Sequence, residues 1–592
     1  MKVHEIHEIH KKAELRGTGV VHSPGEDVWR PGTFRLCPFE YVVDIFRSGS
    51  AALLLVVLAL FVSPHSYGAF GVTDDGQALV VDSGAGLVFK VGKTNGDILS
   101  LRYKGGPELQ EPRRHSQIAS GLGGSKVAST IIGGKVIKIT VATDENNGVV
   151  KNLTHYFLVR SGVNNVYMAT YTAAEPHVGE LRWITRLEQS VFPNSPKPSN
   201  TREAAKAIES RDVFGCNDGT TRSKYYGDAQ SHGKDRAMDM TFCGVSGQGV
   251  GVWMVYGSRE SSSGGPFHRD IQNQSTEVYN YMNSGHNMTE PPRLNVLHAP
   301  YALVFTDGEP PRLPLDFSWI DTAGLDLLGY VPASQRGAVA GLATGVATGL
   351  PGLIGFSNES AQYWAKVGAD GAYVSPLMKS GNYEVKLYQG ELAVGAALVR
   401  VQAGIKARLD LSATPVPLTL FRIGEWDGTP AGFLNGDKIV MMHPSDARMS
   451  PWGPVTFTVG VDSVAKFPAL QLRKTNSPTT IKFRLTREQL ADRILRIGIT
   501  CTYGSGRPDI RVNNWKPAKP SEAVEQPRSR SFTIGTYRGN NATFTYTIPA
   551  SAFVAGENTL TIAPLSGSGD LTQWLSAGWA YDAIQLDEKP AH

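Results

Sequence analysis

Val250-Gly251-Val252-Trp253-Met254-Val255-Tyr256 is rich in β-branched and aromatic residues, and it contains no helical stripe of apolar side chains. Residues 87–91 (LVFKV) and 135–141 (KVIKITV) have the same character. Such residues favour extended strands over helices. Repeated over about 260 residues with turns between, the pattern predicts a large antiparallel β-sandwich spanning residues 69–328.

Two further β domains are expected downstream. Residues 383–388 (YEVKLY) and 398–401 (LVRV) are period-two strands within a unit, 329–414, of about the size of an immunoglobulin-like sandwich. Its Gly- and Ala-rich stretch, 337–352, resembles a linker in composition alone. The third unit, 415–592, alternates again, with strands predicted at 455–459, 481–485 and 543–548.

Length and composition agree with this organisation. A chain of 592 residues exceeds one hydrophobic core, so two to four domains are expected, and 64 glycines with 35 prolines suit strands joined by turns. The net charge is only +4, and the cations are scattered, which gives no case for a nucleic-acid partner. We expect a mostly β monomer.

Residues 1–68 are expected to form an upstream extension and a secretory signal. Residues 51–62 (AALLLVVLALFV) are too short to span a bilayer but fit the apolar region of a signal peptide, with Arg47 before them and a cut ahead of Ala69. The polar stretch before them is unusual for a signal and suggests a mispredicted gene start. The alternative is a cytoplasmic tail on a short anchor. Cleavage would leave a secreted protein with no membrane segment.

Three short blocks concentrate the reactive side chains: Thr221–Tyr226 (TRSKYY), Ser261–Asp270 (SSSGGPFHRD) and Tyr279–His286 (YNYMNSGH). They bring lysine, arginine, tyrosine and histidine together without a dominant pair of carboxylates. Glycoside hydrolysis usually needs two opposed carboxyl groups, so this inventory better suits proton abstraction from an anionic sugar.

These blocks resemble the fungal rhamnogalacturonan lyases of polysaccharide lyase family 4. The likeness begins at Ala69-Phe70-Gly71-Val72-Thr73, passes through 168–171 (MATY) and 179–182 (GELR), and continues past 424–428 (GEWDG). It implies a catalytic sandwich, a central fibronectin III-like or immunoglobulin-like domain with strands around a loop at 337–352, and a C-terminal jelly roll resembling a carbohydrate-binding module. It also implies β-elimination in the rhamnogalacturonan I backbone of pectin, with no cofactor required for catalysis, and it leaves open a structural calcium in the outer domains.

Lys224 and His286 are the candidate catalytic pair. Lys224 lies beside Arg222 and, in the expected site, Arg182, and neighbouring cations favour a neutral amine that can act as a base. His286 follows a Ser-Gly turn signal, from which an imidazole could protonate the leaving oxygen. The resemblance places the family's two catalytic residues at these positions. Which of them is the acid stays open, and a solvated lysine or a structural histidine is the alternative.

Four residues are candidates for substrate binding. Arg182 matches a substrate-contacting arginine of the family and could grip a uronate carboxylate through both guanidinium nitrogens, unless it is paired with Glu180 or Glu188. Arg222 would add positive charge nearby. Tyr279 and Tyr281, two apart on a predicted strand, should face the same side, either toward sugar or toward the core.

The remaining block, Ser261–Asp270, is dominated by turn residues and is expected to position its neighbours, with Phe267 as an anchor. Its His-Arg-Asp triplet mimics a kinase catalytic loop, but no glycine-rich phosphate loop accompanies it. In the third domain, five tryptophans are candidates for sugar stacking or, more commonly, for the core: Trp426, Trp452, Trp515, Trp574 and Trp579.

Cysteines and glycosylation sequons bear on secretion. Cys37 would leave with the signal, and a bridge between Cys216 and Cys243 would staple the segment that carries Lys224; isolated thiols, with Cys501 as the third, are the alternative. Five glycosylation sequons suit a secreted protein: Asn152, Asn273, Asn287, Asn358 and Asn541. Asn287 directly follows His286 and is expected to be unoccupied, because a glycan there would crowd the site.

Two other functions compete with elimination. A hydrolase could use Glu180, Glu260 and Asp270 as carboxylates, and its products would lack a new double bond. A catalytically silent pectin-binding protein would bind the polymer and leave it intact. Ultraviolet absorbance of the products separates these readings.

Overall fold

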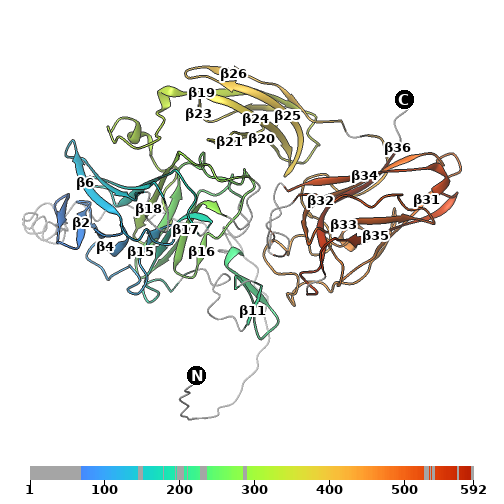
Figure 1. Cartoon of the computed structure of the whole chain (residues 1–592), viewed down its shortest axis with the longest axis horizontal. Helices are drawn as coiled ribbons and strands as arrows, with labels where there is room; N and C mark the ends of the chain where they lie inside the picture. Colours follow the sequence, from blue (N-terminus) through green and yellow to red (C-terminus); the bar gives the residue numbers. More distant parts are fainter. Residues whose placement is uncertain are drawn as a thin grey trace, which may run out of the picture. The chain divides into compact units, whose positions relative to one another are not determined.

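The computed structural model describes residues 68–588 except for short gaps (Figure 1). The gaps are residues 145–150, 178, 194, 196–205, 210, 227–235, 285–289, 416, 526–532, 534, 536–539 and 570–571. The predicted extension and signal, up to residue 67, lie outside the described residues. Within the described part, the secondary structure is strands with short 3₁₀ turns, which confirms the mostly β fold.

The first domain is built around a seven-stranded antiparallel sheet. Its order is β14 (Phe242–Gly247), β15 (Val250–Tyr256), β18 (Val296–Thr306), β9 (Asn165–Thr172), β8 (Leu153–Arg160), β7 (Val136–Ala142) and β6 (Lys126–Ile132). The predicted strand at 250–256 is β15 in full. It is apolar along its whole length because both faces are covered: Val252 and Met254 enter the main core, while Trp253 and Val255 enter a second cluster on the opposite face.

Two four-stranded sheets pack against this central sheet and close the main core. One consists of β1 (Gly71–Asp74), β2 (Ala78–Asp82), β3 (Leu87–Gly92) and β4 (Ile98–Tyr103) in sequence order. The other has the order β16 (Asn273–Gln274), β17 (Glu277–Ser284), β10 (Glu180–Arg186) and β5 (Gln117–Ile118). Side chains from all three sheets share one buried cluster, so the predicted sandwich is confirmed.

A separate three-stranded sheet extends from this domain. It consists of β11 (Lys206–Glu209), β12 (Val213–Gly215) and β13 (Thr221–Ser223), followed at once by the 3₁₀ turn η3 (Lys224–Tyr226). Among the described strands, it pairs with no other sheet. Segment 315–330, with η4 (Ser318–Asp321), covers the outer face of the seven-stranded sheet through Ile320, Leu325 and Leu327.

The central domain is a two-sheet sandwich with its own core. One sheet groups β22 (Ala372–Val374), β19 (Arg336–Thr344), β23 (Met378–Lys379), β26 (Lys406–Arg408) and β27 (Leu411–Ser412), and η5 (Ala333–Gln335) precedes it. The other has the order β21 (Gln362–Lys366), β20 (Gly352–Ser357), β24 (Gly381–Gln389) and β25 (Leu392–Val401). The stretch 337–352 is therefore strands around a loop, as expected, and β24 alternates buried and exposed residues as a half-covered strand should.

The C-terminal domain packs a five-stranded sheet on a four-stranded one. The first has the order β28 (Thr419–Gly424), β36 (Gly578–Glu588), β32 (Arg493–Tyr503) and β34 (Ala542–Ile548), with β30 (Leu470–Leu472) paired to β36. The second has the order β29 (Thr456–Thr458), β31 (Thr479–Leu485), β35 (Gly556–Leu565) and β33 (Arg507–Val512). The 3₁₀ turns η6 (Val464–Lys466) and η8 (Ala550–Ala552) lie between strands, and a third core fills the interior.

Cys216 and Cys243 are both free thiols, so the disulfide that the sequence suggested is wrong. Cys243 is fully buried in the main core, where its Sγ contacts the Tyr256 hydroxyl at 3.0 Å, whereas Cys216 is partly exposed on the small sheet. The sequon at Asn273 is not accessible for glycosylation, because Asn273 is 1% exposed and donates its side-chain amide to the Gly244 carbonyl. Asn287 lies outside the described residues.

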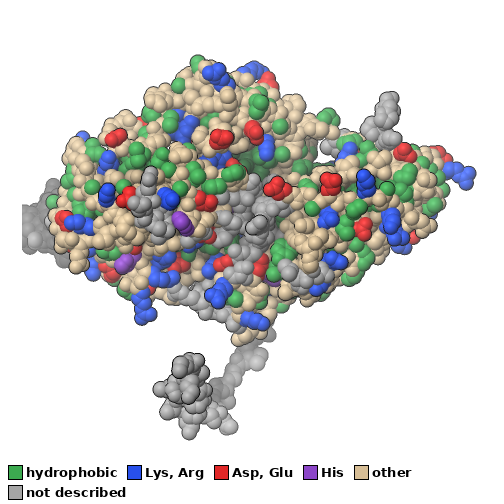
Figure 2. Space-filling view, in the orientation of Figure 1, with side chains coloured by type: hydrophobic (Ala, Val, Ile, Leu, Met, Phe, Trp, Pro, Cys, Tyr) green, Lys and Arg blue, Asp and Glu red, His purple; other side chains and the backbone are tan. Residues whose placement is uncertain are grey.

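The surface mixes charges of both signs. On the face drawn in Figure 2, Lys and Arg side chains are interspersed with Asp and Glu rather than gathered into a stripe. In the part of the chain that the structure describes, no helix is long and apolar enough to cross a membrane.

Candidate active site

Strands β10 and β17 carry three of the predicted substrate-binding residues. They pair antiparallel, with Arg182 opposite Tyr281 and Ile184 opposite Tyr279 across the register. The two tyrosine rings lie on the same side, as expected, stacked with centroids 5.7 Å apart. Both are about 5% exposed or less, so the core-facing alternative describes their rings better than open sugar stacking.

Burial raises the pKa of both phenols well above its ordinary value. They therefore stay protonated and can donate a hydrogen bond. Tyr279 donates to the Glu277 carboxylate at 2.5 Å, and the Tyr281 hydroxyl accepts a bond from Arg182 at 2.8 Å. The pair acts as a platform beneath the guanidinium.

Arg182 lies over the Tyr281 ring, 5.5 Å from its centroid, and its Nη1 also contacts the Glu180 carboxylate. This is the ion pair that the sequence raised as an alternative; Glu188 instead accepts hydrogen bonds from Ser190. The Arg182 side chain keeps 20% of its surface exposed, and among the described residues its Nη2 reaches the Ser120 hydroxyl, at 3.5 Å. One edge of the guanidinium is thus anchored and the other is lightly held.

Lys224 opens the 3₁₀ turn that ends the small sheet. Its ammonium forms an ion pair with Asp212 at 3.0 Å, and its backbone N–H donates to the Asp212 carbonyl at 3.1 Å. The sequence argument named only the cations Arg222 and Arg182 as neighbours and missed this carboxylate. The structure therefore corrects the expected surroundings of the amine: Asp212, from the turn between β11 and β12, holds it.

A small apolar cluster joins the Lys224 turn to the tyrosine strand. Tyr225, directly after Lys224, shares it with Tyr279 and Tyr281, and the other members are Ile184, Val213 and Ile271. The first and third sequence blocks therefore meet, as expected. His286 lies outside the described residues; the strand is described up to Ser284, two residues before it.

The second block holds these elements in place. Arg269 is fully buried, and its Nη2 donates to the Tyr225 carbonyl at 2.9 Å while its Nη1 donates to the Val440 carbonyl at 2.7 Å. Phe267 packs edge-on against Tyr388 of the central domain, with centroids 5.0 Å apart. Gly264 has φ +106°, and a side chain there would collide with the His268 ring, so the bend requires glycine.

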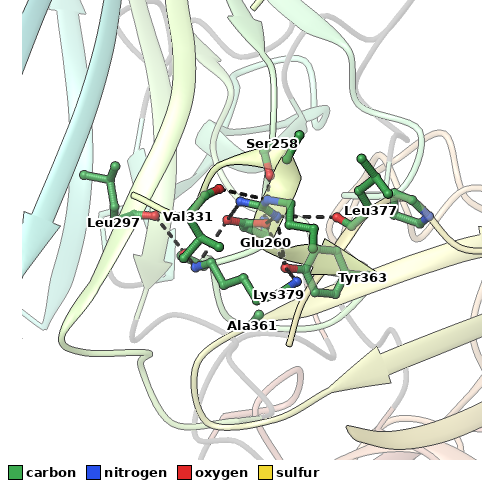
Figure 3. Close-up of polar contacts among 12 residues, drawn as sticks. Ser258, Glu260, Leu297, Val331, Ala361, Tyr363, Leu377 and Lys379 are labelled. Carbon is green, nitrogen blue, oxygen red and sulfur yellow. Dashed lines mark hydrogen bonds and ion pairs between the residues drawn. The ribbon is translucent and has the colours of Figure 1, made fainter. Parts of the chain in front are cut away.

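The carboxylates that a hydrolase would need are engaged elsewhere. Glu260 is 8% exposed and receives two bonds from Arg336, at 2.6 and 3.0 Å, one from the Tyr363 hydroxyl at 2.8 Å, and an ion pair with Lys379 at 3.2 Å (Figure 3). Burial by itself would raise the pKa of Glu260, but Arg336, Lys379 and Tyr363 outweigh it and leave the pKa lowered. A carboxylate in that state is a poor general acid.

Asp270 is 4% exposed and lies 3.8 Å from His268, and Glu180 is paired with Arg182. Each of the three suggested carboxylates thus lies within 4 Å of a basic side chain. Within the described ranges, no group of three or more His, Cys, Asp or Glu residues could hold a metal ion.

The tryptophan candidates separate by burial. Trp579 is fully buried in the C-terminal core, so sugar stacking at that position is wrong. Trp452, Trp515 and Trp574 pack as partly buried residues against the same core. Trp426 donates its indole N–H to Gln585 at 2.8 Å.

Comparisons with known proteins cover all three domains. Residues 70–327 match the family described as "Rhamnogalacturonan lyase B, N-terminal", residues 335–409 match "Polysaccharide lyase family 4, domain II", and residues 419–586 match "Polysaccharide lyase family 4, domain III". The chain therefore belongs to polysaccharide lyase family 4.

Full-length fungal relatives give the same result. The chain is 41% identical over 543 residues to "Probable rhamnogalacturonate lyase A" of Aspergillus clavatus, a match that covers 90% of this chain and 98% of the relative. It is 39% identical over 541 residues to "Rhamnogalacturonate lyase A" of Aspergillus aculeatus, covering 90% and 99%. For the protein of that name from Emericella nidulans, the identity is 41% over 528 residues, covering 88% and 96%.

Proposed function

We propose that this protein is a rhamnogalacturonan endolyase, which cleaves the rhamnose-(1,4)-galacturonate bond of pectin by β-elimination. The observation that carries the proposal is the match across all three domains to family 4 lyases. The site is compatible with it, because Tyr281 anchors Arg182 and the apolar cluster that contains Tyr279 and Tyr281 also contains Tyr225, the residue after Lys224. The unsaturated galacturonate would form at the new non-reducing end.

Elimination removes the C5 proton of galacturonate, places charge on the carboxylate as an enolate-like intermediate, and expels O4. Arg182 is suited to hold that carboxylate, because its lightly held Nη2 edge can donate to a substrate oxygen while Tyr281 fixes the other edge. Arg222 would supply further positive charge. We propose that these cations meet the electrostatic demand without a metal cofactor.

Lys224 and His286 would share the two proton transfers. An ammonium at Lys224 would deliver a proton to O4 as the acid, whereas a neutral amine would take the C5 proton as the base. Asp212 is suited to aim the amine in either role. The acid and base assignments of the pair remain for kinetics to decide.

The protein would act outside the cell. Support comes from the sequence, where the apolar run at 51–62 resembles a signal peptide, and from a substrate that is a plant cell-wall polymer. Glycosylation of the exposed Asn152 would make it a glycoprotein. A monomer is sufficient for the proposed chemistry.

The test is to incubate purified protein with rhamnogalacturonan and, separately, with homogalacturonan, and to follow the ultraviolet absorbance of new double bonds. Absorbance should rise only with rhamnogalacturonan and should disappear in Lys224→Ala and His286→Ala. New reducing ends without absorbance would establish hydrolysis. Binding of the polymer with no cleavage would establish a binding protein.

A further inference from the structure

Within its own domain, the Lys224 turn is held by side-chain packing, through Tyr225 and Val213, and by no strand pairing with another sheet among the described residues. It ends a three-stranded sheet, β11–β12–β13, that is hydrogen-bonded to no other sheet among the described strands. A three-stranded sheet with strands of three or four residues depends on packing against its neighbours for stability. Something beyond its own ladder must fix it to within the tolerance that proton transfer requires.

Part of that support comes from residues 440–447 of the C-terminal domain. Asp446 Oδ2 accepts two bonds from Thr221, one from the backbone N–H at 2.6 Å and one from the hydroxyl at 2.7 Å. The His443 N–H donates to the same hydroxyl at 3.1 Å, and the Ala447 N–H donates to the Gly219 carbonyl at 3.0 Å. Thr221 is three residues before Lys224.

A second tether grips the other end of the turn. Arg269 joins the Tyr225 carbonyl to the Val440 carbonyl through two buried hydrogen bonds. Lys224 is therefore held from both sides, by Thr221 before it and by Tyr225 after it, and both connections lead to the same eight residues of another domain. His443 adds a third contact, with its Nε2 3.5 Å from Glu209, which the strand register places at the Lys224 end of the small sheet.

The supporting segment is itself well fixed. It belongs to the long connection between β28 and β29, which buries Phe433, Ile439 and Met449 in the C-terminal core. Asn435 closes the loop by donating to the Ser450 carbonyl and accepting from the Ser450 N–H, both at 2.9 Å. Asp446 is 3% exposed, and the bonds from Arg448 and Thr221 outweigh its burial and lower its pKa to about 2, so it accepts hydrogen bonds as a carboxylate.

We propose that the C-terminal domain builds the active site, with Asp446 as a positioning residue that fixes the Lys224 turn through Thr221. The inference rests on the proposed function, since it takes Lys224 to be catalytic. Under it, the carbohydrate-binding-module-like domain is a structural part of the catalytic centre rather than an independent targeting module. Its loop sets the geometry of the proton transfer.

The experiment compares Asp446→Ala and Thr221→Val with their conservative partners, Asp446→Asn and Thr221→Ser, which keep an oxygen at the contact. Asp462→Ala is the matched control, because Asp462 also accepts a backbone N–H (Thr458, 2.7 Å) and pairs with a cation (Lys466, 2.9 Å), but its partners all lie within the C-terminal domain. Thermal unfolding, kcat and KM on rhamnogalacturonan are measured for the full-length chain.

The alanine and valine variants should lower kcat by about tenfold to a hundredfold with KM changed less than about twofold, because misplacement of one reacting group has effects of that order. Both conservative variants should recover most of kcat, and Asp462→Ala should leave it unchanged. If Asp446→Ala fails to fold, the kcat of Thr221→Val tests the same contact from its other side.

Equal kcat values for Asp446→Ala, Thr221→Val and Asp462→Ala, together with an inactive Lys224→Ala, would overturn the positioning role and leave the proposed function standing. A Lys224→Ala enzyme that keeps its kcat would overturn the catalytic assignment and the inference with it. A rise in KM alone would also overturn the inference, since it would place the domain in substrate capture.

Discussion

Glu260 offers a stringent test of how the first two domains are joined. Replacing it in Glu260→Gln keeps the shape but removes the charge that Arg336 and Lys379 share, and both of these side chains are at most 14% exposed. The amide also presents an N–H group where the carboxylate accepted bonds from donors. Breaking a buried ion pair on one side typically costs about 3–5 kcal/mol, and the same loss is expected here.

The matched control is Glu557→Gln. Glu557 pairs with Lys482 at a similar distance, 3.0 Å, but the two side chains are 53% and 39% exposed. An exposed pair contributes at most about 1 kcal/mol, so this variant should unfold like the parent. Urea unfolding followed by tryptophan fluorescence is the assay, analysed by its first transition because a three-domain chain need not unfold in two states.

The loss of stability caused by Glu260→Gln should become smaller at acidic pH. The pKa of Glu260 is lowered in the folded protein, so its contribution is present above the unfolded pKa of about 4.3 and is lost as the pH falls through the folded value. The kcat of folded enzyme should stay within about twofold of the parent. If Glu260→Gln left the first urea transition unchanged, the argument from the buried ion pair would be refuted. If the variant folded but was inactive, Glu260 would be a candidate catalytic carboxylate of a hydrolase.

Three further outcomes are expected. Asp212→Asn should reduce kcat by about tenfold by releasing the Lys224 amine, while Asp218→Asn, a turn residue of the same hairpin, should not; equal values would show that the ion pair has no role in turnover. His155 is 1% exposed, and burial lowers its pKa to about 3. As the pH falls from about 6.5 toward 3, the unfolded chain therefore binds a proton at His155 that the folded protein does not bind, which lowers the free energy of unfolding by up to about 5 kcal/mol. The stability of His155→Phe relative to the parent should accordingly be higher at pH 4 than at pH 7 in urea titrations, and a difference that does not change with pH would contradict this reasoning. Peptide mapping after secretion should find Asn273 unmodified, because its amide is buried against Gly244; a glycan there would contradict the packing.

The fold followed closely from patterns that depend on local chemistry. The run at 250–256 was predictable because β-branched and aromatic residues fit a strand in any context, and β15 has those bounds. The common side of Tyr279 and Tyr281 followed from the period of a strand. The Gly- and Ala-rich stretch at 337–352 carried no such signal, and its strands were expected only from the family resemblance.

The partners of the site residues were less accessible, because they depend on packing between distant segments. Asp212 is twelve residues before Lys224, and only the hairpin that joins them brings the carboxylate to the amine. The disulfide prediction failed for a related reason: it depended on secretion into an oxidising compartment, whereas the sheet order buries Cys243 in the main core and leaves Cys216 on the separate small sheet.

Asp446 shows the same limit at the largest separation. It lies 225 residues from Thr221, in a domain whose sequence suggested carbohydrate binding, and nothing in its local pattern separates it from the turn-forming Asp462. Only the buried contact distinguishes the two, because one carboxylate caps its own loop while the other caps the strand that leads into the Lys224 turn. Among the described strands the small sheet pairs with no other sheet, so the order of the proposed catalytic amine depends on that distant contact together with the apolar packing of Tyr225, and the first and third domains position it jointly.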